Sequence, residues 1–275
     1  MVGIRDAVAG LRATERSVAL VPTMGALHDG HLALVRRARE IADAVVVSIF
    51  VNPLQFGAGE DLDRYPRTFD ADLAALGREG VDLVFAPTVD EMYPTGAVET
   101  TVVAGHVGTL YEGASRPGHF DGMLTVVAKL FHIVQPDTAV FGQKDAQQVF
   151  LVRRMVSDLN APLAIEVVPT VREPDGLALS SRNRYLDADG RRAALALSES
   201  LAAAESAASD GLDEVLAEAA AAFGDHDGID LDYLVVVDPE TFLPVDEGAN
   251  GAATVLVAAR VGGTRLIDNA AIRLG

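Results

Sequence analysis

Short apolar stretches alternate with helix-like stretches along the first part of this chain, and that alternation constrains the fold more than any other feature. Strands are expected over residues 17–23, 44–51, 81–86, 138–141 and 165–171, where β-branched and other apolar residues run together. Strands that alternate with helices predict an α/β fold with a doubly wound, parallel, Rossmann-like sheet. The G-x-G-x-x-G fingerprint is missing after the first strand, which argues against a nicotinamide or flavin dehydrogenase.

The pattern changes near residue 171. A turn-rich stretch is followed by two Ala-rich helices between residues 187 and 223, and then by strands over residues 231–237 and 254–259. We therefore expect two domains, a Rossmann-like nucleotide-binding domain over residues 1–170 and a smaller α+β, lid-like domain over residues 171–275.

The stretch SVALVPTMGALHDGHLALVR, residues 17–36, reads as a strand, a sharp turn at Gly25 and a helix that begins near His28 or Asp29. His28 and His31 are three residues apart and share one face of that helix. Gly30 between them leaves room for a flat ligand against the backbone. A helix N-terminus presents unpaired N–H groups to anions, so two imidazoles beside it fit phosphate binding. The alternative is a plain strand, turn and helix with two exposed histidines.

Polar side chains follow other expected strands as well. Asn52 and Gln55 follow the second strand, at the edge where ligands bind in an open parallel sheet, although a plain turn is the alternative. Lys144 follows the strand at 138–141 and is a compact cation suited to phosphate. Arg116 lies in a polar loop that could face a cleft.

A second polar group lies beyond the expected sheet, where Ser180, Ser181 and Arg182 place two hydroxyls and a guanidinium close together. A solvated turn is the alternative interpretation of this triplet.

Composition excludes several classes of protein. The net charge of −18 argues against a nucleic-acid partner, because duplex binding needs a basic face. No apolar run approaches the ~20 residues that span a bilayer, and no signal peptide is visible. The chain has no cysteine, which excludes disulfides and thiolate metal sites. We therefore expect a cytoplasmic protein without a membrane partner.

Five motifs in order give the chain a close resemblance to the pantothenate synthetase family, also called pantoate–β-alanine ligases. They are PTMGALHDGH (22–31), FVNPLQFGAGEDLDRYPRT (50–68), RPGHFDGMLTVV (116–127), FGQKDAQQ (141–148) and LALSSRNRYL (177–186). The resemblance implies ATP-dependent condensation of (R)-pantoate with β-alanine to give pantothenate, AMP and diphosphate. It implies a pantoyl-adenylate intermediate, with ATP and pantoate bound by the first domain.

The resemblance also implies roles for individual residues, with His31 in the position of a proton donor. Charge cancellation is expected from His28, His31, Lys144 and Arg182, and the serines beside Arg182 belong to the same catalytic group. The residues matching the family's ATP site are Met24, Gly25, Ala26, Leu27, His28, Asp29, Gly30, His31, Gly142, Gln143, Lys144, Asp145, Val171, Leu179, Ser180, Ser181 and Arg182.

Further expectations concern the other ligands and the assembly. Substrate binding is expected from Gln55, Gln148, Asn52 and Arg116. Mg²⁺ is expected on the phosphates, held mostly by ligand oxygens and water, and Asp72 matches an acidic position that the family links to the metal. Family members are generally dimers, so a homodimer is expected.

Two other functions are weighed against the ligase. A nucleotidyltransferase of the same His-x-Gly-His superfamily would keep the nucleotide on its product, whereas a ligase releases AMP. A nucleotide-binding sensor would bind ATP without consuming it, and the two histidines, Lys144 and Arg182 argue against that.

Overall fold

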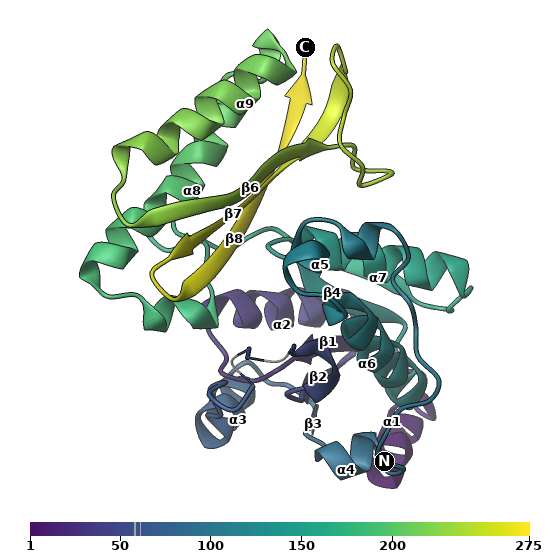
Figure 1. The fold of residues 1–275 in the computed structure, drawn as a ribbon. Coiled ribbons are helices and arrows are strands. Elements are labelled where there is room, and N and C mark those ends of the chain that lie inside the picture. Colours follow the sequence, from purple (N-terminus) through teal and green to yellow (C-terminus); the bar gives the residue numbers. More distant parts are fainter. Residues whose placement is uncertain (58, 61) are drawn as a thin grey trace. The chain divides into compact units, whose positions relative to one another are not determined.

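A computed structural model of the chain describes residues 1–57, 59–60 and 62–275, and these residues form two compact units (Figure 1). The first unit holds residues 1–142 and 147–169, and the second holds residues 143–146 and 170–275. Ala58 and Asp61, which belong to the 50–68 motif, lie outside the described residues.

The first unit is built on a five-stranded parallel sheet with the strand order β3-β2-β1-β4-β5. The order reverses between β1 and β4, which are neighbours in the sheet although β2 and β3 lie between them in the chain. The expected doubly wound parallel sheet is confirmed, and ligands bind such sheets outside the carboxyl ends of the strands at this reversal. The strands are β1 (Val18–Thr23), β2 (Ala44–Ile49), β3 (Leu83–Phe85), β4 (Thr138–Gly142) and β5 (Ala164–Val168).

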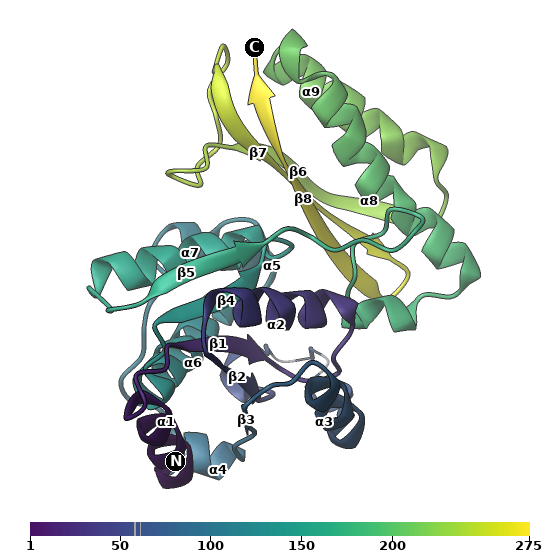
Figure 2. The ribbon, with the colours of Figure 1, turned by 180° about the vertical axis from the view of Figure 1, so that it is seen from behind.

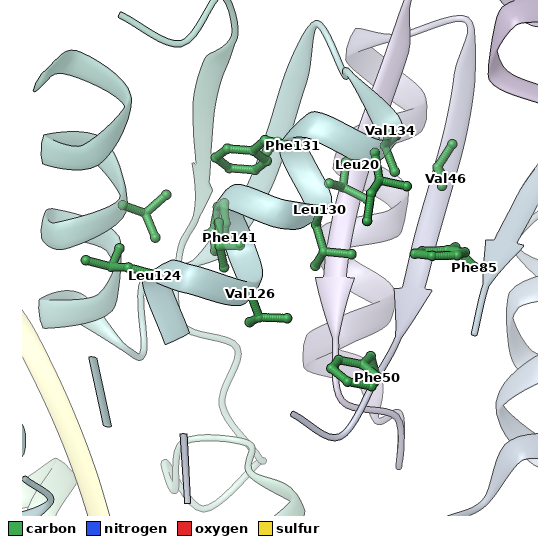
Figure 3. Close-up of a cluster of buried hydrophobic side chains, with 14 of the residues drawn as sticks. Leu20, Val46, Phe50, Phe85, Leu124, Val126, Leu130, Phe131, Val134 and Phe141 are labelled. Carbon is green, nitrogen blue, oxygen red and sulfur yellow. The ribbon is translucent and has the colours of Figure 1, made fainter. Parts of the chain in front are cut away.

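Helices cover both faces of the sheet. Successive side chains of a strand point to opposite faces, so each strand contributes to a hydrophobic cluster on either side. Leu20 of β1 packs in a cluster with residues of α1, α6 and α7, and Figure 3 shows Leu130 and Val134 of α6 beside it. Val21 packs on the other face with residues of α2 and α3. The helices are α1 (Val2–Arg12), α2 (Asp29–Ile41), α3 (Phe69–Arg78), α4 (Val89–Met92), α5 (Glu112–Ser115), α6 (His119–Val134) and α7 (Ala146–Asp158).

The second unit is a small α+β structure (Figure 2). Helices α8 (Ala188–Ser206) and α9 (Leu212–Ala221) share a core with an antiparallel sheet of order β6-β7-β8. Its strands are β6 (Ile229–Val237), β7 (Gly251–Val261) and β8 (Thr264–Leu274). Strand β8 was not expected from the sequence, because the polar pair Asp268–Asn269 interrupts its apolar residues.

Short 3₁₀ helices connect the larger elements. They are η1 (Pro53–Gln55), η2 (Val107–Thr109), η3 (Ser181–Tyr185), η4 (Ala208–Asp210) and η5 (Ala222–Asp225). No helix in the described part of the chain combines the length and apolar content needed to span a bilayer.

Candidate functional site

The turn between β1 and α2 is held in an uncommon backbone conformation by one buried carboxylate. Gly25 and Ala26 both have positive φ, at 80° and 50°. Asp72 of α3 accepts the N–H of Ala26 at 3.0 Å and the N–H of Leu27 at 2.9 Å. A Cβ on Gly25 would lie 3.1 Å from the Asp72 carboxylate, so glycine lets that carboxylate approach. The turn therefore depends on a residue 46 positions further along the chain.

The two histidines lie together at the start of α2, as expected. The helix begins at Asp29 with His28 as its N-cap, and the imidazole centroids of His28 and His31 are 4.1 Å apart. Nδ1 of His31 accepts the backbone N–H of His28 at 3.3 Å. In the neutral His31 ring the proton therefore sits on Nε2, which makes that nitrogen a donor. This donor lies beside the positive end of the helix dipole, an arrangement suited to an anionic ligand.

Asn52 lies directly before η1 and Gln55 is the last residue of η1, so both follow the carboxyl end of β2. Asn52 is 1% exposed, and its amide donates to Oε1 of Gln55 and to the carbonyl of Gly122, both at 3.1 Å. Its Oδ1 accepts from the Tyr93 hydroxyl at 2.6 Å and from the N–H of Leu54 at 3.3 Å. These four bonds use the full capacity of the amide. Asn52 therefore fits a positioning role for Gln55 better than the direct substrate contact expected from the sequence.

Gln55 is the member of this pair that reaches the β1–α2 turn. Its side-chain amide lies 3.4 Å from the sulfur of Met24, and Asn52 orients its oxygen. The structure thus brings the expected substrate residue Gln55 to the turn that leads to the two histidines.

Arg116 is engaged with protein groups at the other side of Gln55. Its guanidinium bonds both oxygens of Glu60, at 3.0 and 2.7 Å, and donates to Nε2 of His119 at 3.0 Å. Nδ1 of His119 in turn donates to the backbone carbonyl of Gln55 at 2.8 Å. Burial alone would raise the pKa of Glu60, but the hydrogen bonds and charge of Arg116 outweigh it and lower that pKa. Arg116 therefore supports the backbone of Gln55, where the sequence predicts a direct substrate contact.

In the second unit, the segment that leads to Ser180 folds back on itself. The Leu179 N–H donates to the Val171 carbonyl at 2.9 Å, which pairs two residues of the expected ATP site. Arg191 of α8 bonds Glu173 and Asp175 within this segment, and its hydrogen bonds lower the pKa of both carboxylates. The segment is thus fixed by charge-assisted bonds to its own unit.

The serine pair itself begins η3. Ser180 is the N-cap of η3, and its hydroxyl accepts the N–H of Arg182 at 3.3 Å. Gln143, Lys144 and Asp145 belong to the same unit as this triplet. In the first unit, Gly142 ends β4, and Gln148 lies half-buried in the first turn of α7.

Several residues of these arrangements were not expected from the sequence. Tyr93 bonds Asn52, and Glu60 and His119 bond Arg116. In β8, Asn269 bonds Gln143 and Lys144, and Asp268 bonds Arg172. For the two residues of β8, the available signal was a polar pair between the apolar residues 266–267 and 270–272.

Comparisons with known proteins give one consistent result. The profile of the family described as "Pantoate-beta-alanine ligase" matches residues 2–271. A pantothenate synthetase of Leifsonia xyli subsp. xyli is 65% identical over 258 residues, which cover 94% of this chain and 89% of that protein.

Two solved structures are also similar. The crystal structure of pantothenate synthetase from Thermus thermophilus has a TM-score of 0.90 at 52% identity, over 96% of each chain. The pantoate–β-alanine ligase from Francisella tularensis, complexed with "Beta-gamma ATP and Beta-alanine", has a TM-score of 0.78 at 34% identity, over 97% of this chain and 95% of that one.

Proposed function

Because this chain belongs to the pantoate–β-alanine ligase family, we propose that it joins (R)-pantoate to β-alanine at the expense of ATP. A pantoate carboxylate oxygen attacks the α-phosphorus of ATP and diphosphate leaves. The amine of β-alanine then attacks the acyl carbon of pantoyl adenylate, an amide forms, and AMP leaves. The observation that carries this proposal is the paired imidazoles of His28 and His31 at the start of α2, in a chain that matches the family from residue 2 to residue 271.

The first unit is proposed to hold the reacting phosphate and the acid. The N–H groups of the first turn of α2 and the Nε2 donor of His31 would stabilise the negative charge that develops on the α-phosphate. His28 contributes a second imidazole 4.1 Å away. Gln55 would bind both pantoate and β-alanine, and Gln148 would bind pantoate. The same proposal places the nucleotide against residues 24–31 and Gly142.

The second unit is proposed to supply the cations. Joining a carboxylate to a triphosphate brings two anions together, and the Lys144 ammonium and Arg182 guanidinium would offset their repulsion. Ser180, Ser181, Val171 and Leu179 complete the proposed nucleotide contacts, with Gln143 and Asp145 beside Lys144.

Asp72 does not fit the role of a direct Mg²⁺ ligand. It is 3% exposed, and its oxygens accept from the N–H groups of Ala26 and Leu27 and from the Thr68 hydroxyl. In the described part of the chain, no three His, Asp or Glu side chains form a group that could hold a metal ion. Mg²⁺ is therefore proposed to be held by phosphate oxygens and water.

Replacing Asp72 by asparagine is expected to lower both stability and activity. The amide would turn one acceptor into an NH₂ group that faces a backbone N–H, and each buried polar group left unsatisfied costs about 1–3 kcal/mol of unfolding free energy. Ligase activity is expected to fall at every Mg²⁺ concentration, measured from the Mg²⁺ dependence of the rate. Recovery of the wild-type rate at high Mg²⁺ would instead make Asp72 a metal ligand.

Exchange of label between diphosphate and ATP tests the proposed reaction. Pantoate-dependent exchange without β-alanine is expected, because adenylate formation is reversible and precedes amine attack. With β-alanine added, AMP and pantothenate should appear in equal amounts. No exchange in folded protein would overturn the proposal, and a product that keeps its nucleotide would identify a nucleotidyltransferase.

The remaining parts of the proposal concern the organisation of the enzyme. Residues 1–170 are proposed as the ATP- and pantoate-binding domain, and residues 171–275 as a lid-like domain. We further propose a homodimer in the cytoplasm. Sedimentation of the purified chain tests whether it is a homodimer. A monomer at micromolar concentration would contradict that proposal.

A further inference from the structure

The turn that carries Lys144 belongs to the second unit, although the elements on both sides of it belong to the first. Residues 143–146 follow β4 and lead into α7, yet they group with residues 170–275. The turn therefore packs with the second unit, and a single side chain of β8 makes several hydrogen bonds to it.

Asn269 is that side chain. Its amide nitrogen donates to the carbonyl of Gln143 at 3.0 Å and to the carbonyl of Lys144 at 2.8 Å. Its Oδ1 accepts from the side-chain amide of Gln143 at 3.5 Å. Both amide hydrogens are used on two successive peptide groups, so the position and the orientation of the turn are fixed together.

Asn269 is buried, so its amide depends on the hydrogen bonds that it makes to the Lys144 turn. The residue is 5% exposed within an antiparallel strand, a setting that favours β-branched and aromatic residues. A buried amide is costly unless its hydrogen bonds are made, and here the Lys144 turn makes them. No other part of the proposed chemistry needs an amide at this position.

The neighbouring residue of β8 holds the other cation-bearing segment. Asp268, also buried, bonds the guanidinium of Arg172 at 2.5 and 3.1 Å, and Arg172 pairs with Ala178 two residues before Ser180. Two successive residues of β8 therefore contact the segments that carry Lys144 and Arg182.

We propose that Asn269 is a positioning residue that places Lys144 for phosphate binding. A lysine ammonium sits on a flexible four-carbon stem, so its reach depends on where its backbone is held. Asn269 holds that backbone at the carbonyl of Lys144 itself. The inference rests on the proposed function, in which Lys144 binds the triphosphate of ATP.

The test is a double-mutant cycle with Asn269→Ala and Lys144→Ala, read as kcat/KM for ATP in pantoate-dependent diphosphate exchange. Asn269→Ala alone is expected to lower kcat/KM by about tenfold to a hundredfold, the scale of a misplaced binding group. In the Lys144→Ala background the same change should lower it less than about twofold, because residues that act as a unit are not additive. If the alanine variant does not fold, Asn269→Ser takes its place in the same cycle, because serine offers one hydroxyl donor but cannot bond both carbonyls of the turn at once.

Ile272→Val is the matched control, since Ile272 is buried in the same strand and belongs to the core of the second unit. It should lower the melting temperature without changing kcat/KM. Losses that multiply in the double variant, or an Asn269→Ala enzyme as active as the control, would overturn the inference. Absence of exchange in the wild type would refute the proposed function instead, and the same cycle would then be read as affinity for ATP.

Discussion

Replacing His31 by alanine is expected to slow pantoate-dependent diphosphate exchange by about 10²–10³-fold, the usual cost of removing one donor to a developing charge. The change also removes the acceptor of the His28 N–H, and loss of a helix cap costs about 1 kcal/mol of unfolding free energy. The rate should therefore fall far more than the stability. Exchange kinetics and thermal unfolding of the same preparation measure the two effects.

His31→Gln separates the cap from the chemistry. Glutamine at the third helical position can accept the N-cap N–H, as in a capping box, but it has no imidazole. We expect this variant to keep the wild-type melting temperature and still to lose most of the rate, because its amide can donate a hydrogen bond but cannot carry a proton as an imidazole does. His132→Ala is the control, because His132 is exposed on α6 and bonds the Ala128 carbonyl of its own helix. A glutamine variant with the wild-type rate would show that the reaction needs no proton carried by the His31 imidazole.

Replacing Gly122 by alanine is expected to damage both stability and activity. A Cβ at this position of α6 would lie 2.1 Å from the carbonyl oxygen of Leu54 and 2.8 Å from the nitrogen of Gln55. Both are backbone atoms, so η1 or α6 must move, and overpacking of this kind typically costs about 1–3 kcal/mol of unfolding free energy or more. Because η1 carries Gln55, the KM for pantoate is expected to rise as well.

Gly77→Ala is the matched control for this prediction. Gly77 is also helical, in α3, but a Cβ there would meet no atom within 4 Å. Alanine should therefore raise the unfolding free energy by up to about 1 kcal/mol through helix propensity alone. Thermal unfolding of the two variants should shift the melting temperature in opposite directions. Equal shifts would contradict the close approach of α6 to η1.

The expectations that came from local patterns agree with the structure. The doubly wound parallel sheet is present, and α2 begins at Asp29 with His28 and His31 on one side of its first turn. Periodicity, turn residues and helix caps act over a few positions, so neighbouring residues suffice to read them. The motifs for the family also lie within short stretches of the chain.

Three of the polar residues named from the sequence are bonded to protein groups at distant positions. Asn52 is bonded to Tyr93 and Gly122, Arg116 to Glu60, and Asp72 to the backbone of the β1–α2 turn. Asn52 and Arg116 were expected to bind substrate, and Asp72 matched a position that the family links to the metal. In sequence, a polar residue near a motif looks the same whether its partner is a ligand or the protein. Only the packing of α3 and α6 against the sheet decides which partner each has.

By itself, then, the sequence determined the alternating strands and helices of the parallel sheet, the start of α2 and the family. Tertiary structure alone decided that Asp72 holds the turn before the histidines, and that β8 holds the turn of Lys144 from 125 positions away. The physical reason is that backbone conformation is set by near neighbours, whereas hydrogen-bond partners of buried polar groups are chosen when distant segments pack together.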